Sequence, residues 1–259
     1  MITYKTTDDI ALMKKGGSIL AAALLAVQSA VKPGIGIHGL DRIAREYIES
    51  HGGAPAFLGY GTARGVVGYP STLCISINDE VVHGIGIRDI VLHEGDIVGL
   101  DIGTRYPAND GLYTDMAVTV GVGKISVDAQ SLIDVTRVSL DRAIALVRPG
   151  ISIHEISKEV QGYCEGHGYS LIRDLTGHGV GFSVHEDPPV PNYFDERMPD
   201  VILKEGMVIC IEPMVAMGDW HVFTDTDEWT VRTADHSLAA HFEHTIAVTA
   251  GGHEILTLA

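Results

Sequence analysis

The sequence predicts a mixed α/β fold made of two similar halves related by a pseudo-two-fold axis. The segment Val31–Gly52 aligns without gaps with Val147–Gly168 at a spacing of 116 residues, and ten of the 22 positions are identical. Similarity at a fixed spacing is typical of internal duplication. In both copies, apolar strand segments that carry acidic residues follow the aligned segment. We therefore expect a single catalytic domain over residues 1–259, with approximate halves 1–125 and 126–259.

Two helices are expected in each half. The first should run from about Asp8 to Val31, because Thr6 followed by Asp9 is a capping pattern. In each half, a Pro-Gly pair ends the first helix. A second helix then begins near Ile-x-Ile-His and ends at a His-Gly pair. Two lysines and an apolar run in the first helix resemble a secretory signal, but acidic residues ahead of them are unusual there. No uninterrupted apolar run reaches the roughly 18 residues of a membrane span, so we expect a packed helix and no membrane partner.

Composition restricts the classes of function. With 46% hydrophobic and 20% charged residues, the 259-residue chain is typical of a soluble globular protein. Its net charge of −16 works against nucleic acid or anionic membranes as required partners, because both bind Lys- and Arg-rich surfaces. The three cysteines, Cys74, Cys164 and Cys210, include no Cys-x-x-Cys pair, so neither a disulfide framework nor a thiolate zinc site is indicated. A reducing, cytoplasmic location is the simpler interpretation.

Each half places two carboxylates on apolar strand segments. Leu92–Asp101 resembles Leu203–Glu212, since both contain a Glu-Gly turn, an apolar run and a final acid. Asp115–Val120 parallels Glu243–Val248 in the same way. A lone acid at a strand end is more often a turn or cap residue than a ligand. Four acids at matching places favour a shared site, because a pseudo-two-fold fold brings them together at its centre.

Such a cluster favours metal binding. Four carboxylates a few ångströms apart cannot all stay ionised without cations, and two divalent ions would balance their charge. His178 stands between two glycines, which allow a close approach to a crowded centre. One histidine and four carboxylates without a thiolate suit Mn, Fe, Co or Zn rather than Cu. Two such ions can activate a water for hydrolysis of amides or phosphate esters. The acidic surface argues against phosphate substrates, whereas a substrate with a free amino group would fit.

Eight motifs together resemble the type I methionine aminopeptidases of the pita-bread fold. They are Ser76–Ile85, Gly95–Asp101, Asp110–Asp115, Gly177–Gly181, His185–Pro188, Ile211–Met214, Trp229–Val231 and Glu243–Ile246. The resemblance covers nearly the whole chain and implies a central, mostly antiparallel sheet covered by helices. It also implies a metal-dependent hydrolase that removes the N-terminal methionine from nascent proteins and peptides with a small second residue. A monomer is expected, and any ribosome contact would use the catalytic domain's own surface.

The resemblance also implies a role for each site residue. The implied metal ligands are Asp101 for one ion, His178 and Glu212 for the other, and Asp115 and Glu243 for both. Glu212 would in addition carry a proton between the water and the departing amine. His185 would donate to the scissile carbonyl oxygen, and His83 would stabilise the side of the peptide nitrogen. Because His178 has no counterpart in the other half, we expect the tighter ion on its side.

The resemblance further implies that a pocket for the methionine side chain is lined by Tyr60, Tyr69, Cys74 and Trp229. This chain departs from the family pattern in three places. About five extra residues separate the two tyrosines, near 61–67, and about three lie near 104–109, where we expect only the turn to lengthen. Val184 replaces a phenylalanine before His185, which widens the pocket wall.

Two other functions are open from the sequence. Proline-specific aminopeptidases share the fold and the ligands, but they carry a further N-terminal domain, and only about 30 residues precede the first repeat here. The type II branch inserts a subdomain between His178 and Glu212, which are 34 residues apart in this chain. The other possibility is a catalytically inactive binding protein of the same fold, which retention of all ligand types disfavours.

Overall fold

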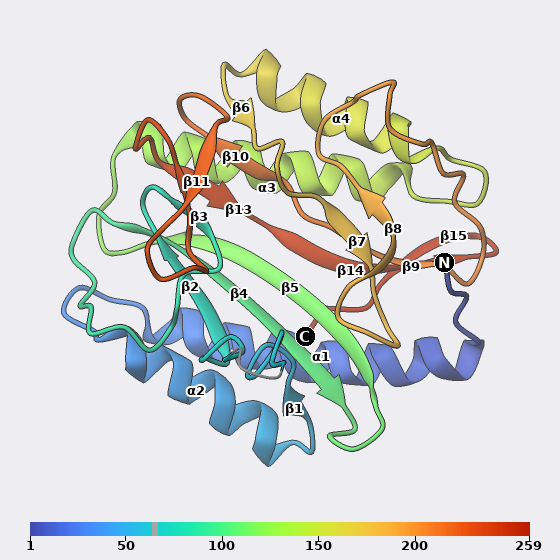
Figure 1. The fold of residues 1–259 in the computed structure, drawn as a ribbon, viewed down its shortest axis with the longest axis horizontal. Helices are drawn as coiled ribbons and strands as arrows, with labels where there is room; N and C mark the ends of the chain where they lie inside the picture. Colours follow the sequence, from blue (N-terminus) through green and yellow to red (C-terminus); the bar gives the residue numbers. More distant parts are fainter. Residues whose placement is uncertain (64–66) are drawn as a thin grey trace.

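The computed structural model describes residues 1–63 and 67–259 and has the predicted α/β architecture. A nine-stranded sheet runs in the order β1-β4-β5-β14-β9-β7-β8, with β2 beside β4 and β15 beside β14, and its strands pair antiparallel (Figure 1). These strands are β1 (Ala54–Pro55), β2 (Leu73–Ile77), β4 (Ile97–Tyr106), β5 (Leu112–Gly121), β7 (Gly177–Gly179), β8 (Glu186–Val190), β9 (Val208–Ile211), β14 (Glu243–Thr249) and β15 (Gly252–Ile255). The predicted mostly antiparallel sheet is therefore confirmed.

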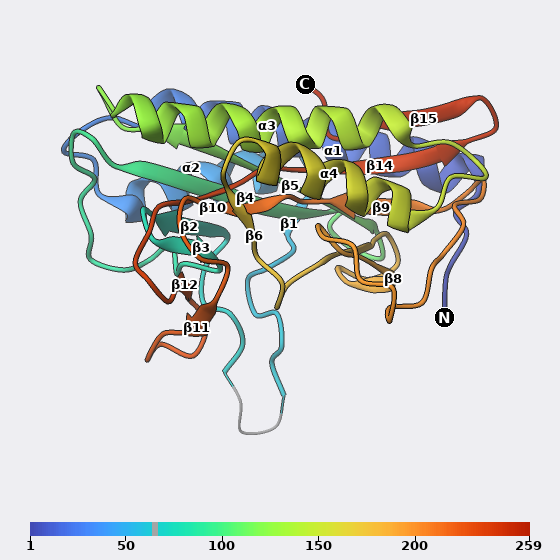
Figure 2. The same ribbon diagram turned by 90° about the horizontal axis from the view of Figure 1, so that it is seen from above.

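The duplication is visible in the order of the elements. The four helices of the described residues are α1 (Thr7–Ala30), α2 (Ile37–Ser50), α3 (Val127–Leu146) and α4 (Ile153–Gly166). They cover one face of the sheet, α1 and α2 over the first half and α3 and α4 over the second (Figure 2). The halves meet where β5 pairs with β14, with β4 and β9 as the outer neighbours. One sheet thus continues through both halves.

Helix α1 matches the prediction to within one residue at each end, and the Thr6–Asp9 capping box is formed. Its apolar residues pack against the strands of the first half, and Gly17 lies so close to the C-terminal segment that a Cβ would be 2.2 Å from the carbonyl oxygen of Leu256. By length and composition alone, α1 is apolar enough to be a candidate membrane span. Buried helices of soluble proteins meet the same criterion, and α1 packs here as one of them.

Of two small sheets, the first packs against α3 and α4, and the second lies on the side away from the helices (Figure 2). One contains β6 (Ser170–Leu171), β10 (Met214–Ala216) and β13 (Ala239–His241), and the other contains β3 (Glu80–Val82), β11 (Val222–Thr224) and β12 (Val231–Thr233). A network of charges fixes the second sheet, because the Arg232 guanidinium binds Asp79, Glu80 and Asp225 at 2.6–2.7 Å. This sheet holds the segments that carry His83 and Trp229.

The long hairpin of β4 and β5 corrects one sequence expectation. The two strands pair without interruption from Ile97–Gly121 to Tyr106–Leu112. Residues 104–106 of the stretch near 104–109 therefore lie on β4 and not in the turn. As a result, β4 continues past Asp101 along the open face of the sheet. The other insertion, near 61–67, includes residues 64–66, which lie outside the described residues.

Candidate active site

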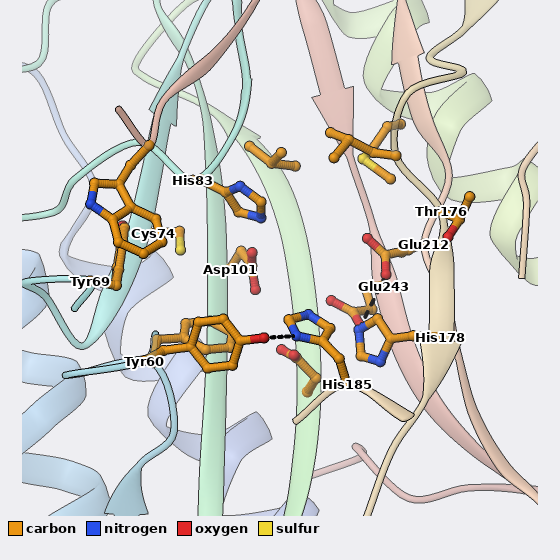
Figure 3. A pocket seen from close by; sticks show the side chains of 16 residues that line it. Tyr60, Tyr69, Cys74, His83, Asp101, Thr176, His178, His185, Glu212 and Glu243 are labelled. Atoms are coloured by element: carbon orange, nitrogen blue, oxygen red, sulfur yellow. Dashed lines mark hydrogen bonds and ion pairs between the residues drawn. The ribbon is translucent and has the colours of Figure 1, made fainter. Parts of the chain in front are cut away.

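The predicted site residues lie around one pocket on the open face of the sheet (Figure 3). The predicted residues that line it are Tyr60, Tyr69, Cys74, His83, Asp101, Asp115, His178, His185, Glu212, Trp229 and Glu243. Sequence reasoning missed five further lining residues, which are Phe57, Val82, Leu175, Thr176 and Met214. Val82 and Met214 lie inside two of the motifs, and Leu175 and Thr176 immediately precede a third, which is the only sequence signal that marks them. Both halves of the chain contribute to the pocket.

Asp101 points away from the helices because of its place on β4. Its neighbours Leu100 and Ile102 are buried in the core under α1 and α2, and alternate residues of a strand face opposite sides. Ala117 on β5 is the cross-strand partner of Asp101 on one side and of Glu243 on the other. The two acids therefore face each other across a single methyl group.

Asp115 lies two residues before Ala117 on β5, so its side chain is on the same face of the sheet as that of Asp101. The hydroxyl of Thr245 on β14 accepts from the Asp115 N–H at 2.9 Å and donates to its carbonyl oxygen at 2.7 Å. Thr119 on β5 bridges the backbone of His241 in the same way, with both distances 2.9 Å. These two threonines join the halves of the chain beside the acids, so the acidic side chains are held on rigid backbone.

His178 enters the site from β7. A Cβ on Gly177 or Gly179 would lie 2.5 Å or less from a carbonyl oxygen of a neighbouring strand, so glycines are required for this approach, as expected. Nδ1 of His178 lies 2.9 Å from the Gly179 carbonyl oxygen. Because a carbonyl only accepts, Nδ1 carries the proton and Nε2 of the neutral ring keeps its lone pair. Burial lowers the pKa of His178 to about 3, which keeps the ring neutral.

The acids are buried together with few partners. The ligand atoms of Asp101, Asp115 and Glu243 lie within 4.8 Å of one another. One oxygen of each of these carboxylates is buried and has no hydrogen-bond partner among the described residues. Burial raises the pKa of Asp101 to about 6, and burial with mutual repulsion raises the pKa values of Asp115 and Glu243 well above the usual range. Unpartnered buried oxygens of this kind fit a divalent cation.

Glu212 lies between two imidazoles. Its Oε1 is 3.4 Å from Nε2 of His178, and its Oε2 is 3.5 Å from Nε2 of His241. A lone pair on His178 facing a carboxylate is repulsive unless a proton or a cation lies between them. His241 is buried on the other side of Glu212, and sequence reasoning missed it. Its only signal was its position two residues before Glu243.

Cys210 is a second residue that the sequence did not place near the acids. Its sulfur forms a potential ligand group with His178 and Glu243 within 4.8 Å. Burial and then the Glu243 charge raise the pKa of the Cys210 thiol well above its usual value. The thiol is therefore protonated, which agrees with the expected site without a thiolate. Glu243 belongs to this group and also to the group of three carboxylates.

Two further histidines flank the acids from opposite sides of the pocket (Figure 3). His83 follows β3 and has a positive φ of 60°, an uncommon backbone conformation for a residue other than glycine. Burial, with the neighbouring His241 and His185, lowers the pKa of His83 to about 4. Burial also lowers the pKa of His185, whose ring lies 4.4 Å from that of His178. Both rings are neutral at pH 7 and can each donate one N–H.

An apolar recess adjoins the acids at one end of the pocket. Tyr69 and Cys74 are buried there, and the Tyr69 ring meets Trp229 edge-on with centroids 5.3 Å apart. The Tyr69 hydroxyl donates to the Gly84 carbonyl oxygen at 2.8 Å, and burial raises its pKa. Tyr60, which the insertion made less certain, also lines the pocket. The recess therefore suits an unbranched apolar side chain close to the acids.

Comparison with known proteins decides the family. A model of metallopeptidase family M24 matches residues 11–250. The chain belongs to metallopeptidase family M24. Methionine aminopeptidases are similar to this M24 peptidase over its length: that of Clostridium perfringens is 44% identical over 259 residues, covering 100% of this chain and 99% of that protein. That of Aquifex aeolicus is 45% identical over 250 residues, covering 96% of each.

Solved structures confirm the predicted pita-bread fold. The methionine aminopeptidase of Thermotoga maritima superposes with a TM-score of 0.93 at 42% identity and full coverage of both chains. The prolidase of Pyrococcus furiosus superposes with a TM-score of 0.76 at 22% identity, covering 99% of this M24 peptidase but 65% of the prolidase. The second similarity concerns the fold alone.

Proposed function

We propose that this M24 peptidase removes the N-terminal methionine from peptides and nascent proteins whose second residue is small. It would act as a monomer in the cytoplasm and use two divalent metal ions. The observation that carries the proposal is an apolar recess beside three buried carboxylates, each with one oxygen that has no hydrogen-bond partner among the described residues. This arrangement offers one place for a flexible thioether side chain and another for the cations that hydrolysis of an amide requires.

Five side chains would hold the ions. Asp101 would bind one ion, His178 and Glu212 the other, and Asp115 and Glu243 both. Support for a shared role of Glu243 comes from its membership in both potential ligand groups. Mn, Fe, Co and Zn suit this set of oxygens and one imidazole. When bound, such ions activate a water and polarise the carbonyl of the scissile peptide bond.

Glu212 is the residue that would move the proton. Its carboxylate would accept a proton from the attacking water and donate it to the nitrogen of the departing peptide. Burial and then the charge of Asp101 raise the pKa of Glu212, which favours the protonated state that a donor needs. The imidazole of His241 would orient the carboxylate from the side away from His178.

The neutral histidines would bind the reacting amide. An N–H of His185 would donate to the carbonyl oxygen as negative charge develops on it. An N–H of His83, on the other side of the acids, would stabilise the peptide nitrogen side. Low pKa values keep both rings neutral, so neither competes with the cations by bringing its own positive charge.

The methionine side chain would occupy the recess formed by Tyr69, Cys74 and Trp229, with Tyr60 at its edge. A proline-specific peptidase is less well supported, because the prolidase and the Xaa-Pro dipeptidase share 22% and 20% identity with this chain, against 44% and 45% for two methionine aminopeptidases. An inactive binding protein would have no use for three such buried carboxylates, which are costly without cations.

Release of methionine from Met-X peptides tests the proposal. Metal-free protein reloaded with Mn, Fe, Co or Zn should cleave Met-Ala and Met-Gly peptides and should leave Met-Leu and Met-Phe peptides intact. A matched panel of Ala-Pro and Leu-Pro peptides should not be cleaved. Cleavage of the proline panel would instead support the proline-specific function, and no cleavage of any peptide would support a binding protein.

A further inference from the structure

Arg105 lies on the open face of the sheet, beyond the acids. It is four residues after Asp101 on β4, so both side chains are on the same face. Its cross-strand partner is Tyr113, which shares its face of β5 with Asp115. At about 3.3 Å per residue, roughly 13 Å of strand separates the Cα atoms of Asp101 and Arg105. The extension of the hairpin past the acids thus places an arginine in line with the candidate catalytic centre.

The guanidinium of Arg105 has no anionic partner among residues 1–63 and 67–259. It lies over the ring of Tyr113, 5.9 Å from the centroid, and its Nε is buried without an acceptor in this part of the chain. By contrast, Arg88 and Arg232 are each paired with carboxylates at 2.6–2.7 Å. An unpaired arginine with a buried donor is costly, and it is unexpected in a chain of net charge −16. A carboxylate from outside the chain would satisfy it.

Arg105 and Tyr113 line a groove that adjoins the catalytic pocket. Tyr60 lines both hollows, while Phe57 and Val184 pack together in the wall between them. Leu58 and Phe182 also line the groove, and they are 38% and 50% exposed. The groove therefore combines aliphatic and aromatic side chains with one cation, Arg105.

The groove continues from the catalytic pocket on the side of His185. Val184, which lines it, directly precedes His185, and His185 is the proposed donor to the scissile carbonyl. An extended peptide advances about 3.3 Å per residue, the same as the strand beneath it. A peptide that lies along this groove with its first carbonyl at the acids would carry its third to fifth residues over Arg105.

We propose that Arg105 forms a subsite for a carboxylate carried by the third to fifth residue of the substrate. This inference rests on the proposed aminopeptidase function and adds a preference for acidic sequences after the cleaved bond. The carboxylate can come from a Glu or Asp side chain or from the C-terminus of a short peptide, since the guanidinium binds both in the same way.

The test compares peptides that differ in one charge. C-terminally amidated Met-Ala-Ala-Ala-Ala is compared with versions that carry Glu or Lys at the third, fourth or fifth position, and with Met-Ala-Ala-Ala as a free acid. We expect kcat/KM for the best Glu peptide to exceed that of the alanine peptide about fivefold, through KM, and 0.5 M salt to reduce the ratio. The free acid shows whether a terminal carboxylate also serves.

Variants of Arg105 decide whether this residue is responsible. The ratio of Glu to Ala peptides should fall to about one in Arg105→Ala, stay above one in Arg105→Lys, and favour the Lys peptide in Arg105→Glu. Because each ratio is taken within one variant, a loss of folded protein cancels. Arg42→Ala, at an exposed position on α2, should keep the parent ratio. An equal rate for Glu and Ala peptides in the parent, or an unchanged ratio in Arg105→Ala, would overturn the subsite while leaving the release of methionine established. No release from any peptide would instead overturn the proposed function, and the subsite with it.

Discussion

The hydroxyl of Tyr60 lies 2.6 Å from Nδ1 of His185, and this contact joins residues 125 positions apart (Figure 3). A tyrosine hydroxyl that donates to Nδ1 leaves the proton of the neutral ring on Nε2. His185 is neutral because burial lowers its pKa. With the tyrosine as the donor, Nε2 of His185 is the nitrogen that can donate to a carbonyl oxygen.

Replacing Tyr60 with phenylalanine should thus slow the reaction without removing metal. We expect kcat for a Met-Ala peptide to fall about tenfold in Tyr60→Phe, because one tautomer of His185 is no longer favoured. Bound metal should stay at the parent level. Steady-state kinetics with metal analysis measures both, and Tyr47→Phe on α2 is the matched control. An unchanged kcat would show that the hydroxyl has no part in catalysis.

His241 should orient Glu212. Its Nε2 faces Oε2 of Glu212 at 3.5 Å, and the other oxygen faces His178. We predict that His241→Leu lowers kcat about tenfold, whereas His241→Gln, which keeps an N–H donor, loses less. Equal losses in both variants would mean that the packing of this position matters rather than its hydrogen bond.

The stability of the metal-free protein should depend on pH in a particular direction. Burial raises the pKa of Asp101 to about 6, and the pKa values of Asp115, Glu212 and Glu243 are raised further. The folded chain thus binds these protons more tightly than the unfolded chain, so their contribution is full below about pH 4 and is lost as the pH rises through 6 and above. Thermal denaturation should show a Tm difference between metal-loaded and metal-free protein that widens from pH 5 to pH 8. A constant difference would contradict the clustering of the acids.

The two metal ions should differ in affinity. His178 has no counterpart in the first half, so we expect the tighter ion on its side of the site. Calorimetric titration of metal-free His178→Ala should show a weaker first equivalent, by tenfold or more, than the parent protein. A first equivalent of parent affinity would place the tighter ion with Asp101 instead.

Two glycines should respond to alanine with opposite signs. A Cβ on Gly17 would lie 2.2 Å from the carbonyl oxygen of Leu256, whereas a Cβ on Gly162 in α4 would meet nothing within 4 Å. Gly17→Ala should lower the free energy of unfolding by about 1–3 kcal/mol through overpacking. Gly162→Ala should raise it by about 0.5–1 kcal/mol through helix propensity. Urea denaturation of metal-loaded protein measures both changes, and stabilisation by Gly17→Ala would contradict the close packing of α1 on the C-terminal segment.

The sequence predicted the fold where local and repeated signals agreed. The ends of α1 followed from the Thr6–Asp9 capping box, and the internal repeat indicated why Asp101 and Glu212 occupy matching places. The location of the pocket followed from the same symmetry. These signals are local or periodic, so they can be read without knowing the tertiary structure.

Other features depend on packing between distant segments and had no such signal. Cys210 lies beside the acids because β9 pairs with β14, and His241 is at the end of β13, which pairs with β10 in one of the small sheets. The contact of Tyr60 with His185 likewise depends on how the loop after β1 folds over the pocket. The expectation that the extra residues near 104–109 lengthen only the turn is wrong, because residues 104–106 lie on β4 and pair with β5, and only the paired register shows this.

The dinuclear centre can be tested directly by anomalous diffraction from crystals soaked in Mn²⁺. Two anomalous peaks roughly 3.5–4 Å apart are expected between the side chains of Asp115 and Glu243. One peak should also contact Asp101, and the other His178 and Glu212. A single peak, or peaks that do not contact these five residues, would contradict the proposed centre.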